Sequence, residues 1–369
     1  MTKAIFSTPV ARAAVSDPTL TRPDWTAGIY RDREQLWADK NENCDSALAT
    51  VIENIVSDLP RDALFAYPEL TPLYNKLAAM DDLPAVNLLL SAGSDGAIRS
   101  AFEAYVEPGD VVIHTNPTFA MYSVYCQMYG AQPVTLDYQM ANDGPILQLD
   151  AIVKTIKSTS PKLICLPNPD SPTGTVFGLD DMRTIVEAAG QSGALMLVDE
   201  AYFPFYGETI LPWVLDYPHL MVTRTFGKSW GAAGLRVGYA AASREVTLML
   251  HKVKPMYEIG TLSALILEKL LDHRDTMLQS AAALNQGRDQ FQQLLKELGY
   301  ATFPSHGNFF HAAFGTDAEP IHAALKDLIY YRPHYASGCL AGYSRFTAAT
   351  PERLEPIINQ IKRISGENR

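Results

Sequence analysis

The sequence has little of what disulfide-rich, membrane-spanning or nucleic-acid-binding proteins need. Its four cysteines are scattered and form no C-x-x-C pair, so neither a disulfide framework nor structural zinc is expected. No run reaches the roughly 18 consecutive apolar residues of a membrane span, and the N-terminal segment lacks the apolar core of a secretion signal. The net charge of −11 argues against a long nucleic-acid groove. We therefore expect a cytoplasmic protein that binds no metal, membrane or nucleic acid.

Short apolar runs alternate with helix-like segments along much of the chain. The apolar runs span residues 86–93, 110–117, 131–138, 161–169, 193–201, 219–227 and 235–243. Several are apolar nearly throughout, which is typical of strands buried on both faces of a mainly parallel sheet. Helical patterns lie between them, as at 96–106 and 179–193. This alternation predicts a doubly wound α/β fold.

Two changes of pattern divide the chain. Residues 1–45 are irregular, an amphipathic helical pattern starts at residue 46, and a long helical region at 258–299 precedes a mixed segment. We expect a large domain over residues 46–255 and a smaller α+β domain over residues 256–369. Residues 1–45 are expected to form an N-terminal arm that belongs to the small domain.

Polar residues, glycines and prolines cluster where five of the predicted strands end. These segments are Gly93-Ser94-Asp95, Asn116-Pro117-Thr118, Asn168-Pro169-Asp170, Asp199-Glu200 and Thr225-Phe226-Gly227-Lys228. In open α/β sheets, ligands bind outside the carboxyl ends of the strands. We therefore expect the five segments to converge on one crevice.

Lys228 and Asp199 are the first candidates for chemistry. A lysine in a glycine-rich loop is most often merely exposed, but a desolvated lysine near other cations attacks carbonyl groups. Asp199 ends a predicted strand, where an acid usually caps a turn. A pyridoxal-phosphate enzyme needs a carboxylate at such a place, against the pyridinium nitrogen of its cofactor. Tyr202 follows three residues later, either beside the phenolic oxygen of that cofactor or packed under a loop.

The start of the helix after the first polar segment is a candidate phosphate site. Ser94 or Asp95 would cap this helix, and the same geometry offers backbone N–H groups to a phosphate. Thr225 and Arg236 flank the lysine and offer a hydroxyl and a guanidinium. Rival phosphate motifs fail, because a P-loop would need glycine where Val222 stands and no G-x-G-x-x-G follows a strand.

Eight ordered motifs make the chain resemble the class I and II aminotransferases, a family of fold-type I pyridoxal-phosphate enzymes. Within that family it is most similar to the histidinol-phosphate aminotransferases, from about residue 38 to the C-terminus. The motifs are FAYPEL (65–70), SAGSDGAIR (91–99), NPTFAMY (116–122), NPDSPTG (168–174), DEAYFPF (199–205), RTFGKSWGAAGLRVGY (224–239), SHGNFF (305–310) and the stretch from YYRPH to YSRFTAATPE (330–352).

The resemblance implies a role for each matched residue. Lys228 would hold pyridoxal phosphate as a Schiff base and move the substrate proton, and Asp199 would pair with the ring nitrogen. Tyr202 and Ser171 would contact the 3-oxygen of the cofactor. The other implied cofactor contacts are Ser94, Asp95, Thr225 and Arg236 at the phosphate, Phe119 on the ring face, and Tyr67 at the phosphate of a neighbouring subunit's cofactor. The last contact implies a homodimer with composite active sites.

The resemblance also implies the reaction and its substrate contacts. An amino group would pass between an amino-acid donor, with glutamate expected, and a keto or phosphorylated keto acceptor. Arg345 would bind the substrate carboxylate, and Arg332 would add positive charge nearby. Asn43, in the segment Asn41-Glu42-Asn43, is the third candidate substrate contact.

Three departures from the family pattern leave the substrate and the reaction open. Ser171 stands where the family has asparagine, and Gly227 stands where a serine usually precedes the lysine. After Asn43 the chain lacks the tyrosine that faces the substrate in the family. Two alternatives remain at this stage. One is a decarboxylase or lyase with the same fold and cofactor, and the other is a non-catalytic phosphate- or nucleotide-binding α/β protein.

Overall fold

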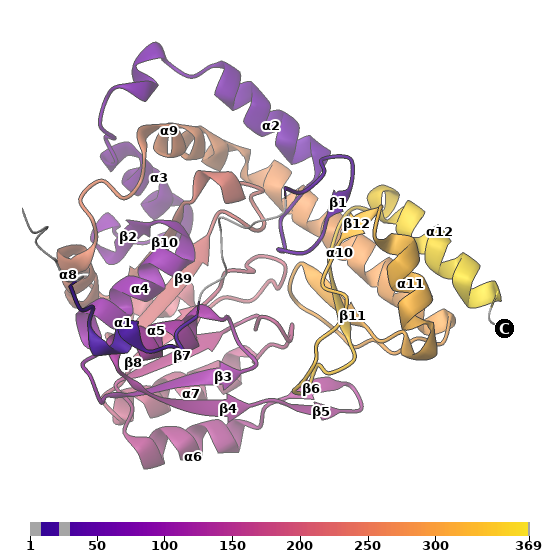
Figure 1. Cartoon of the computed structure of the whole chain (residues 1–369). Helices are drawn as coiled ribbons and strands as arrows, with labels where there is room; N and C mark the ends of the chain where they lie inside the picture. Colours follow the sequence, from indigo (N-terminus) through magenta and orange to yellow (C-terminus); the bar gives the residue numbers. More distant parts are fainter. Residues whose placement is uncertain (1–8, 22–29, 368–369) are drawn as a thin grey trace, which may run out of the picture.

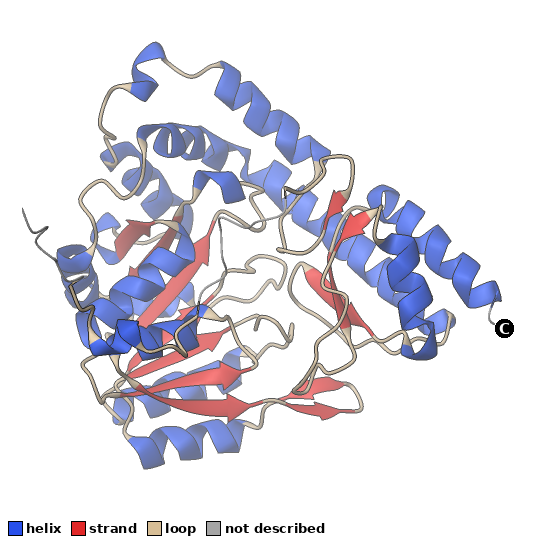
Figure 2. Ribbon diagram, viewed as in Figure 1, coloured by secondary structure: helices blue, strands red, loops and turns tan. Residues whose placement is uncertain are grey.

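The computed structural model describes residues 9–21 and 30–367, which are arranged around a seven-stranded sheet with helices on both faces (Figures 1 and 2). The strands lie in the order β2 (Leu88–Ser91), β10 (Gly238–Ala242), β9 (Leu220–Thr225), β8 (Leu195–Asp199), β7 (Leu163–Pro167), β3 (Val111–Asn116) and β4 (Gln132–Asp137). Strand β10 is antiparallel to both neighbours, and the other pairs are parallel. Each apolar run predicted as a strand contributes one strand of this sheet, so the mainly parallel α/β fold is confirmed.

The sheet is buried on both faces because side chains alternate along each strand. On β2, Leu88 and Leu90 point into one hydrophobic cluster, whereas Leu89 points into the other. The first cluster is covered by α2 (Ser46–Ser57), α3 (Thr71–Asp81), α6 (Leu149–Thr159), α7 (Leu179–Gln191) and α9 (Thr261–Leu270). The second is covered by α4 (Gly93–Tyr105), α5 (Met121–Tyr129) and α8 (Arg244–Val253). Burial on both faces explains why the strands read as almost continuous apolar runs.

The helical region predicted at 258–299 is two helices instead of one. Helix α9 is followed by a 3₁₀ turn, η5 (Leu271–His273), and then by α10 (Arg274–Glu297). Helix α9 packs on α2 and α3, whereas α10 packs on α12 (Pro351–Glu367), β11 (Phe309–Ala312) and also α2. The chain changes direction between these partners, and neither glycine nor proline marks the turn in the sequence.

The C-terminal elements form a second core together with part of the N-terminal arm (Figure 1). Strand β11 pairs with β13 (Ser344–Thr347), and β1 (Leu36–Trp37) pairs with β12 (Ile329–Tyr330). Side chains from α10, α11 (Ala318–Leu325) and α12 complete this core. The domain boundaries stay a prediction, and residues 1–8 and 22–29 of the expected arm lie outside the described residues.

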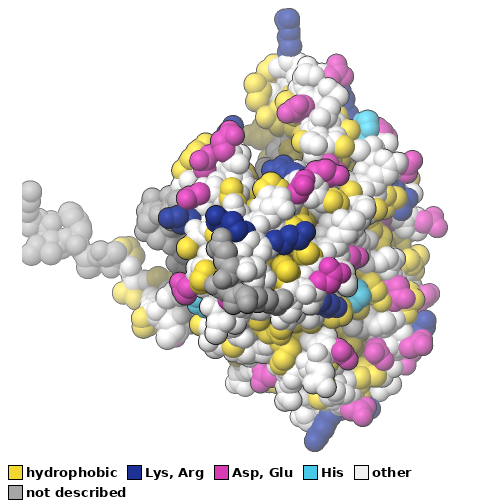
Figure 3. All heavy atoms as spheres, turned by 90° about the vertical axis from the view of Figure 1, so that its right-hand side faces the viewer, with side chains coloured by type: hydrophobic (Ala, Val, Ile, Leu, Met, Phe, Trp, Pro, Cys, Tyr) yellow, Lys and Arg dark blue, Asp and Glu magenta, His cyan; other side chains and the backbone are white. Residues whose placement is uncertain are grey.

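The remaining elements are short. They are α1 (Ala13–Ser16), η1 (Arg61–Leu64), η2 (Ala85–Asn87), β5 (Gln139–Ala141), β6 (Gly144–Ile146), η3 (Leu211–Leu215), η4 (Ala233–Leu235) and η6 (Gly315–Asp317). Within the described ranges, no helix has both the length and the apolar character to cross a membrane. Acidic and basic side chains intermingle on the face that the C-terminal elements present (Figure 3).

Candidate active site

The polar ends of the sheet strands meet around one cavity. Nine of the ten residues predicted to contact the cofactor line it, and they follow five different strands. These nine are Ser94, Asp95, Phe119, Ser171, Asp199, Tyr202, Thr225, Lys228 and Arg236. The expected crevice therefore exists, although the role of each side chain stays a prediction. The tenth residue, Tyr67, does not line this cavity.

Lys228 lies in the loop after β9, where its amine is partly buried. Its Nζ donates a hydrogen bond to the main-chain oxygen of Lys40 at 2.7 Å and lies 5.9 Å from the ring centre of Tyr202. Burial, followed by the positive charge of Arg345, lowers the pKa of Lys228 from 10.5 to about 8. A fraction of this amine is therefore neutral near pH 7, and the neutral form is the one that attacks a carbonyl group.

Asp199 is a buried carboxylate at the end of β8. Its Oδ1 accepts a hydrogen bond from Thr223 at 2.8 Å, and its Oδ2 accepts one from Tyr122 at 3.4 Å. No ion pair joins it to a cationic side chain within the described part of the chain. Burial raises the pKa of Asp199 from 3.8 to about 6. A buried carboxylate gains most from a cationic partner, so this position suits a protonated ring nitrogen.

The two hydroxyl partners of Asp199 were missed by reasoning from the sequence. Thr223 is a polar residue within an otherwise apolar predicted strand, and the register of β8 and β9 places it directly opposite Asp199. That interruption of an apolar run was the available signal. Tyr122 lies on α5, and nothing in its sequence position pointed to the carboxylate.

The first turn of α4 forms an anion cradle with Arg236. The N-cap residue is Ala92, which offers no side-chain cap, so Ser94 and Asp95 lie in the first turn instead of at the cap. The guanidinium of Arg236 lies over Gly93, where a Cβ would stand 2.9 Å from Nη2. A Cβ on Gly238 would stand 2.4 Å from the main chain of Gly93, so both glycines permit the close approach. Helix N–H groups and a guanidinium together suit a phosphate.

Tyr202 connects the two halves of the molecule across the cavity. Its hydroxyl donates to Ser171 Oγ at 3.2 Å and accepts from Asn41 Nδ2 at 2.8 Å. Asn41 belongs to the N-terminal arm and has a left-handed backbone with φ of 57°. Its main-chain N–H donates to Thr347 Oγ1 on β13 at 3.0 Å. The short Ser171 side chain therefore takes part in a hydrogen-bonded chain that begins at Asn41.

The structure does not bring Asn43 to this cavity. Its Nδ2 donates to Ser229 O and to Ser280 Oγ, both at 2.9 Å, so the amide faces the packing between α2, α10 and the loop after β9. Asn41, two residues earlier, is the asparagine of this segment that reaches the site. The left-handed backbone at Asn41 determines that Asn41, and not Asn43, reaches the site. No feature of the sequence indicated this backbone conformation.

Arg345 and Arg332 lie beside Lys228 although they do not line the cavity. Arg345 Nη2 and Arg332 Nε donate to the main-chain oxygen of Asp39 at 2.8 and 3.4 Å. The next carbonyl along the chain, that of Lys40, accepts from Lys228. Arg332 and Arg345 are also paired through their backbones, with N–O distances of 3.1 and 2.9 Å. The carbonyl oxygen that binds both guanidiniums is neutral, so it does not cancel their positive charge. That charge can attract an anionic ligand.

Tyr67 lies on the surface. Its ring is stacked on Tyr257 at a centroid distance of 4.3 Å. It belongs to a set of exposed apolar side chains, which we call the Tyr67 patch: Leu64, Phe65, Tyr67, Met256 and Tyr257, with exposed fractions of 81, 81, 73, 79 and 52%. Contiguous exposed apolar side chains mark interaction surfaces on otherwise polar proteins.

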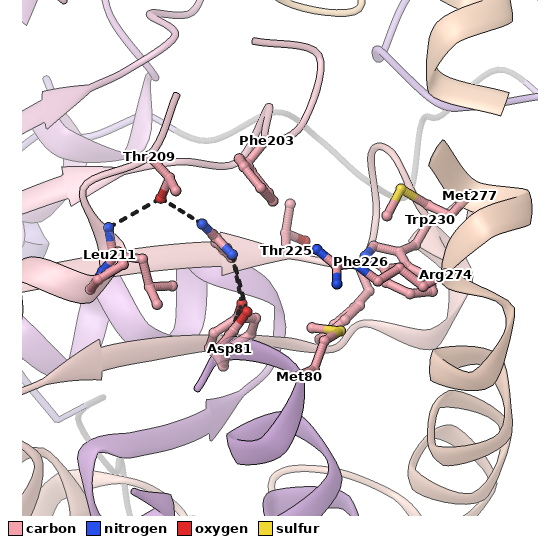
Figure 4. A pocket seen from close by; sticks show the side chains of 13 residues that line it. Met80, Asp81, Phe203, Thr209, Leu211, Thr225, Phe226, Trp230, Arg274 and Met277 are labelled. Atoms are coloured by element: carbon pink, nitrogen blue, oxygen red, sulfur yellow. Dashed lines mark hydrogen bonds and ion pairs between the residues drawn. The ribbon is translucent and has the colours of Figure 1, made fainter. Parts of the chain in front are cut away.

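A second cavity shares Thr225 with the first and lies against the loop after β9 (Figure 4). The buried Arg224 side chain, which lines this cavity, contacts Glu200 at 2.8 Å, Asp81 at 3.3 Å and Thr209 at 2.7 Å. Removing one partner of a buried ion pair costs about 3–5 kcal/mol, so this network fixes the end of β9. Glu200 thus does not line the crevice expected for it, and it supports the strand that precedes the loop with Lys228.

The site contains three parts that fit pyridoxal phosphate: a lone buried carboxylate, an amine of lowered pKa and an anion cradle. These parts lie at the carboxyl ends of the strands of a mainly parallel sheet, which is where α/β proteins bind their ligands. Fold and site together define a pyridoxal-phosphate-dependent enzyme.

The chain belongs to the family described as aminotransferase class I and II, whose model matches residues 34–361. It is 34% identical over 333 residues to a histidinol-phosphate aminotransferase of Thermoanaerobacter sp. (strain X514), covering 88% of this chain and 92% of the relative. It is thus a pyridoxal-phosphate-dependent aminotransferase that transfers an amino group from a donor to a keto acceptor. The prediction from the sequence motifs is confirmed, and transamination is favoured over both alternatives.

Solved structures share the fold. The histidinol-phosphate aminotransferase of Sinorhizobium meliloti in complex with pyridoxal-5′-phosphate has a TM-score of 0.77 at 20% identity, covering 90% of this chain and 92% of that one. The N-succinyldiaminopimelate aminotransferase of Mycobacterium tuberculosis has a TM-score of 0.71 at 20% identity, covering 89% and 92%. At this identity the likeness shows the fold alone. The two enzymes carry the names of different substrates, so the shared fold does not identify a substrate.

Proposed function

We propose that this aminotransferase exchanges an amino group between glutamate and a phosphorylated keto acceptor whose amino form is histidinol phosphate. The observation that carries this proposal is the pair of guanidiniums of Arg332 and Arg345 beside Lys228, held on one main-chain oxygen. One pair of cations serves a carboxylate in one half-reaction and a phosphate in the other, because both anions accept forked hydrogen bonds from arginine. The names of the relatives in the sequence comparison support the same substrate.

The residues around the cavity would hold the cofactor at its two ends. Pyridoxal phosphate, when bound, supplies an electron-withdrawing ring that takes up the electron pair of a broken substrate bond. Asp199 would keep the ring nitrogen charged, and Phe119 would cover one ring face. The phosphate would lie on the anion cradle, with contacts from Ser94, Asp95, Thr225 and Arg236.

Lys228 would act on the substrate as a base. Its lowered pKa, about 8, lets it accept a proton from the substrate Cα near neutral pH and return it later. Tyr202, held between Asn41 and Ser171, would orient the 3-oxygen of the cofactor in place of the asparagine that the family usually has there. Arg345 would fix the substrate carboxylate, so that the Cα–H bond points toward the lysine.

The substrate assignment is tested by separate half-reactions of the holoenzyme. With glutamate and no acceptor, each site is expected to release one equivalent of 2-oxoglutarate. Histidinol phosphate is expected to react in the same way, and histidinol, which lacks the phosphate, about 100-fold less efficiently in kcat/KM because the charged hydrogen bonds are lost. Equal efficiency of histidinol and its phosphate, or release of carbon dioxide from glutamate, would contradict the proposal.

We also propose that the chain is a homodimer in which the Tyr67 patch of each subunit packs against the other. Phe65→Asp, in the middle of the patch, is expected to convert a dimer to a monomer in sedimentation experiments at micromolar concentration, because it buries an unpaired charge. Leu215→Asp is the control, since Leu215 is 55% exposed and lies outside the patch. A wild-type monomer, or a Phe65→Asp dimer, would show that the patch is not the interface.

The same dimer would place Tyr67 at the partner's cofactor. Tyr67→Phe is then expected to raise the dissociation constant of pyridoxal phosphate about tenfold, without changing the oligomeric state, because one hydrogen bond to a charged group is lost. Equilibrium dialysis of the cofactor measures this effect. An unchanged dissociation constant would be compatible with the dimer but would show that Tyr67 does not contact the cofactor.

A further inference from the structure

Four buried polar atoms, one on Arg345 and three on neighbouring side chains, lack hydrogen-bond partners among the described residues. They are Arg345 Nε, both ring nitrogens of His311 and the hydroxyl of Tyr335, and none has a partner within residues 9–21 and 30–367. A buried polar atom without a hydrogen bond is costly, and such atoms are few in folded proteins. Four of them on three neighbouring residues therefore call for a common explanation.

His311 and Arg345 lie side by side on the same face of the small sheet. The antiparallel register of β11 and β13 pairs them directly, which puts their Cβ atoms roughly 4.5–5.5 Å apart. Phe309 lies on the same face two residues earlier, and the guanidinium carbon of Arg345 is 5.6 Å from its ring centre. The guanidinium thus extends along β11 toward Phe309, which leaves Nε, on the stem of the side chain, next to His311.

Tyr335 also neighbours His311. The two ring centres are 6.1 Å apart, and the imidazole is stacked on Phe303 at 4.9 Å. The main-chain N–H of Tyr335 donates to Tyr343 O at 2.9 Å, which anchors its loop. The phenol ring of Tyr335 is thus a direct neighbour of the imidazole, and its hydroxyl is one of the buried atoms without a partner among the described residues.

The donors and acceptors of the three side chains match in one arrangement. Burial, together with the charge of Arg345, keeps the pKa of His311 well below its ordinary value, so the ring is neutral. A neutral imidazole has one acceptor nitrogen and one N–H donor, Arg Nε only donates, and a tyrosine hydroxyl does both. All four atoms are paired when Arg345 Nε–H donates to one imidazole nitrogen and the other donates to the Tyr335 hydroxyl.

We propose that His311 and Tyr335 are positioning residues for Arg345, joined to its Nε in one hydrogen-bonded chain. Nη2 of Arg345 is already bound to Asp39 O. A second bond at Nε holds the planar group at two corners, so its remaining N–H groups point in one direction. A guanidinium whose orientation is fixed beforehand loses less conformational freedom when it binds an anion. The inference rests on the proposed role of Arg345 as the ligand of the substrate carboxylate.

The test compares variants of His311 and Tyr335 with matched controls. His311→Leu is expected to raise the KM for glutamate about tenfold with kcat within about twofold, and Tyr335→Phe about threefold, because Arg345 is less well fixed. The dissociation constant of succinate, an unreactive dicarboxylate, is measured by calorimetry on the holoenzyme and should rise by the same factors. His306→Leu and Tyr343→Phe are the matched controls, and both should bind succinate as the wild type does.

Rescue by an amide separates positioning from packing. His311→Asn places a carbonyl oxygen near the position of Nδ1, and His311→Gln places one near the position of Nε2. One of the two is expected to restore the succinate constant to within about threefold of the wild type, which also identifies the accepting nitrogen. If His311→Leu fails to fold, the two amide variants and Tyr335→Phe decide the question. Wild-type succinate binding in Tyr335→Phe would overturn the proposal. Succinate constants more than about threefold above the wild-type value in both amide variants would also overturn it.

An Arg345→Ala variant distinguishes this inference from the proposed function. It is expected to weaken succinate binding at least about 100-fold, because the cationic ligand of the carboxylate is removed. Unchanged succinate binding would mean that Arg345 is not the carboxylate ligand, whatever the variants of His311 do. Strong loss in Arg345→Ala, with no effect in the variants of His311 and Tyr335, would overturn the positioning network alone.

Discussion

Replacing Lys228 by alanine is expected to slow transamination by roughly 10²–10⁴-fold, the range that a positioned acid–base group contributes. The variant should still bind pyridoxal phosphate, because the anion cradle and Asp199 are untouched. Single-turnover kinetics with glutamate measure the first effect, and equilibrium dialysis measures the second. Borohydride treatment adds a chemical readout: it should attach the cofactor covalently to Lys228 in the wild type and to no residue in the variant.

Lys254 provides a matched control for this experiment. Burial also lowers the pKa of Lys254, but this lysine does not line the cavity. If lowered pKa alone determined reactivity, mass spectrometry would find the cofactor on both lysines after borohydride treatment. We expect it on Lys228 only, and Lys254→Ala should react at the wild-type rate within about twofold. A label on another lysine, or a Lys228→Ala variant with more than a tenth of the wild-type rate, would refute the assignment.

Replacing Asp199 by asparagine is expected to lower kcat between about 10²- and 10⁴-fold. The carboxylate is buried, and losing one partner of a buried ion pair costs about 3–5 kcal/mol, with a tenfold change in rate for each 1.36 kcal/mol. Asparagine keeps the shape of the side chain and a hydrogen bond for Thr223, so the fold should be retained.

Asp170 is the matched control: burial raises its pKa to about 6 as well, but it does not line the cavity. Asp170→Asn should stay within about tenfold of the wild-type kcat, and an equal loss in both variants would argue against a cofactor role for Asp199.

In the cofactor-free protein the same substitution is expected to stabilise the fold. The pKa of Asp199 is raised by burial from 3.8 to about 6, so the folded state binds its proton more tightly than the unfolded state does. The resulting cost to folding is absent below about pH 4, grows between pH 4 and 6, and is complete above pH 6. The difference between 3.8 and about 6 corresponds to roughly 3 kcal/mol.

Urea unfolding of the cofactor-free wild type and Asp199→Asn at pH 4, 6 and 8 measures this cost. The free energy of unfolding of the variant should exceed that of the wild type by up to about 3 kcal/mol at pH 8 and by little at pH 4. A wild type that is the more stable protein at pH 8 would mean that Asp199 has a stabilising partner without the cofactor. With cofactor bound, the order of the two proteins should reverse, since the carboxylate then has its cation.

The large sheet was predictable from the sequence because its strands are buried on both faces. Six of the seven strands are buried at nearly every position, which favours apolar side chains along them, whereas the edge strand β4 is mostly exposed. The same topology explains why the cavity residues were found. Parallel strands all end at one edge, so polar segments that follow the apolar runs must meet there, whatever their separation in the chain.

Features that join distant segments were not predictable in this way. The choice of Asn41 over Asn43 depends on a left-handed turn that is fixed by Thr347, about 300 residues away in the chain. The break between α9 and α10 has no glycine or proline. Both helices pack on α2, but α3 contacts α9, whereas α12 and β11 contact α10. Each of these outcomes is decided by contacts that form only when the chain has folded.

The sequence by itself determined the α/β class, the cofactor and the lysine that would carry it, since local pattern and short motifs specify these. Tertiary structure alone decided which polar groups surround the residues of the site. Asp199 meets Thr223 through strand register, Tyr202 meets Asn41 across the cavity, and Arg345 meets His311 across the small sheet. The physical reason is that a motif fixes the residues within it, whereas hydrogen-bond partners from distant segments depend on how the elements pack.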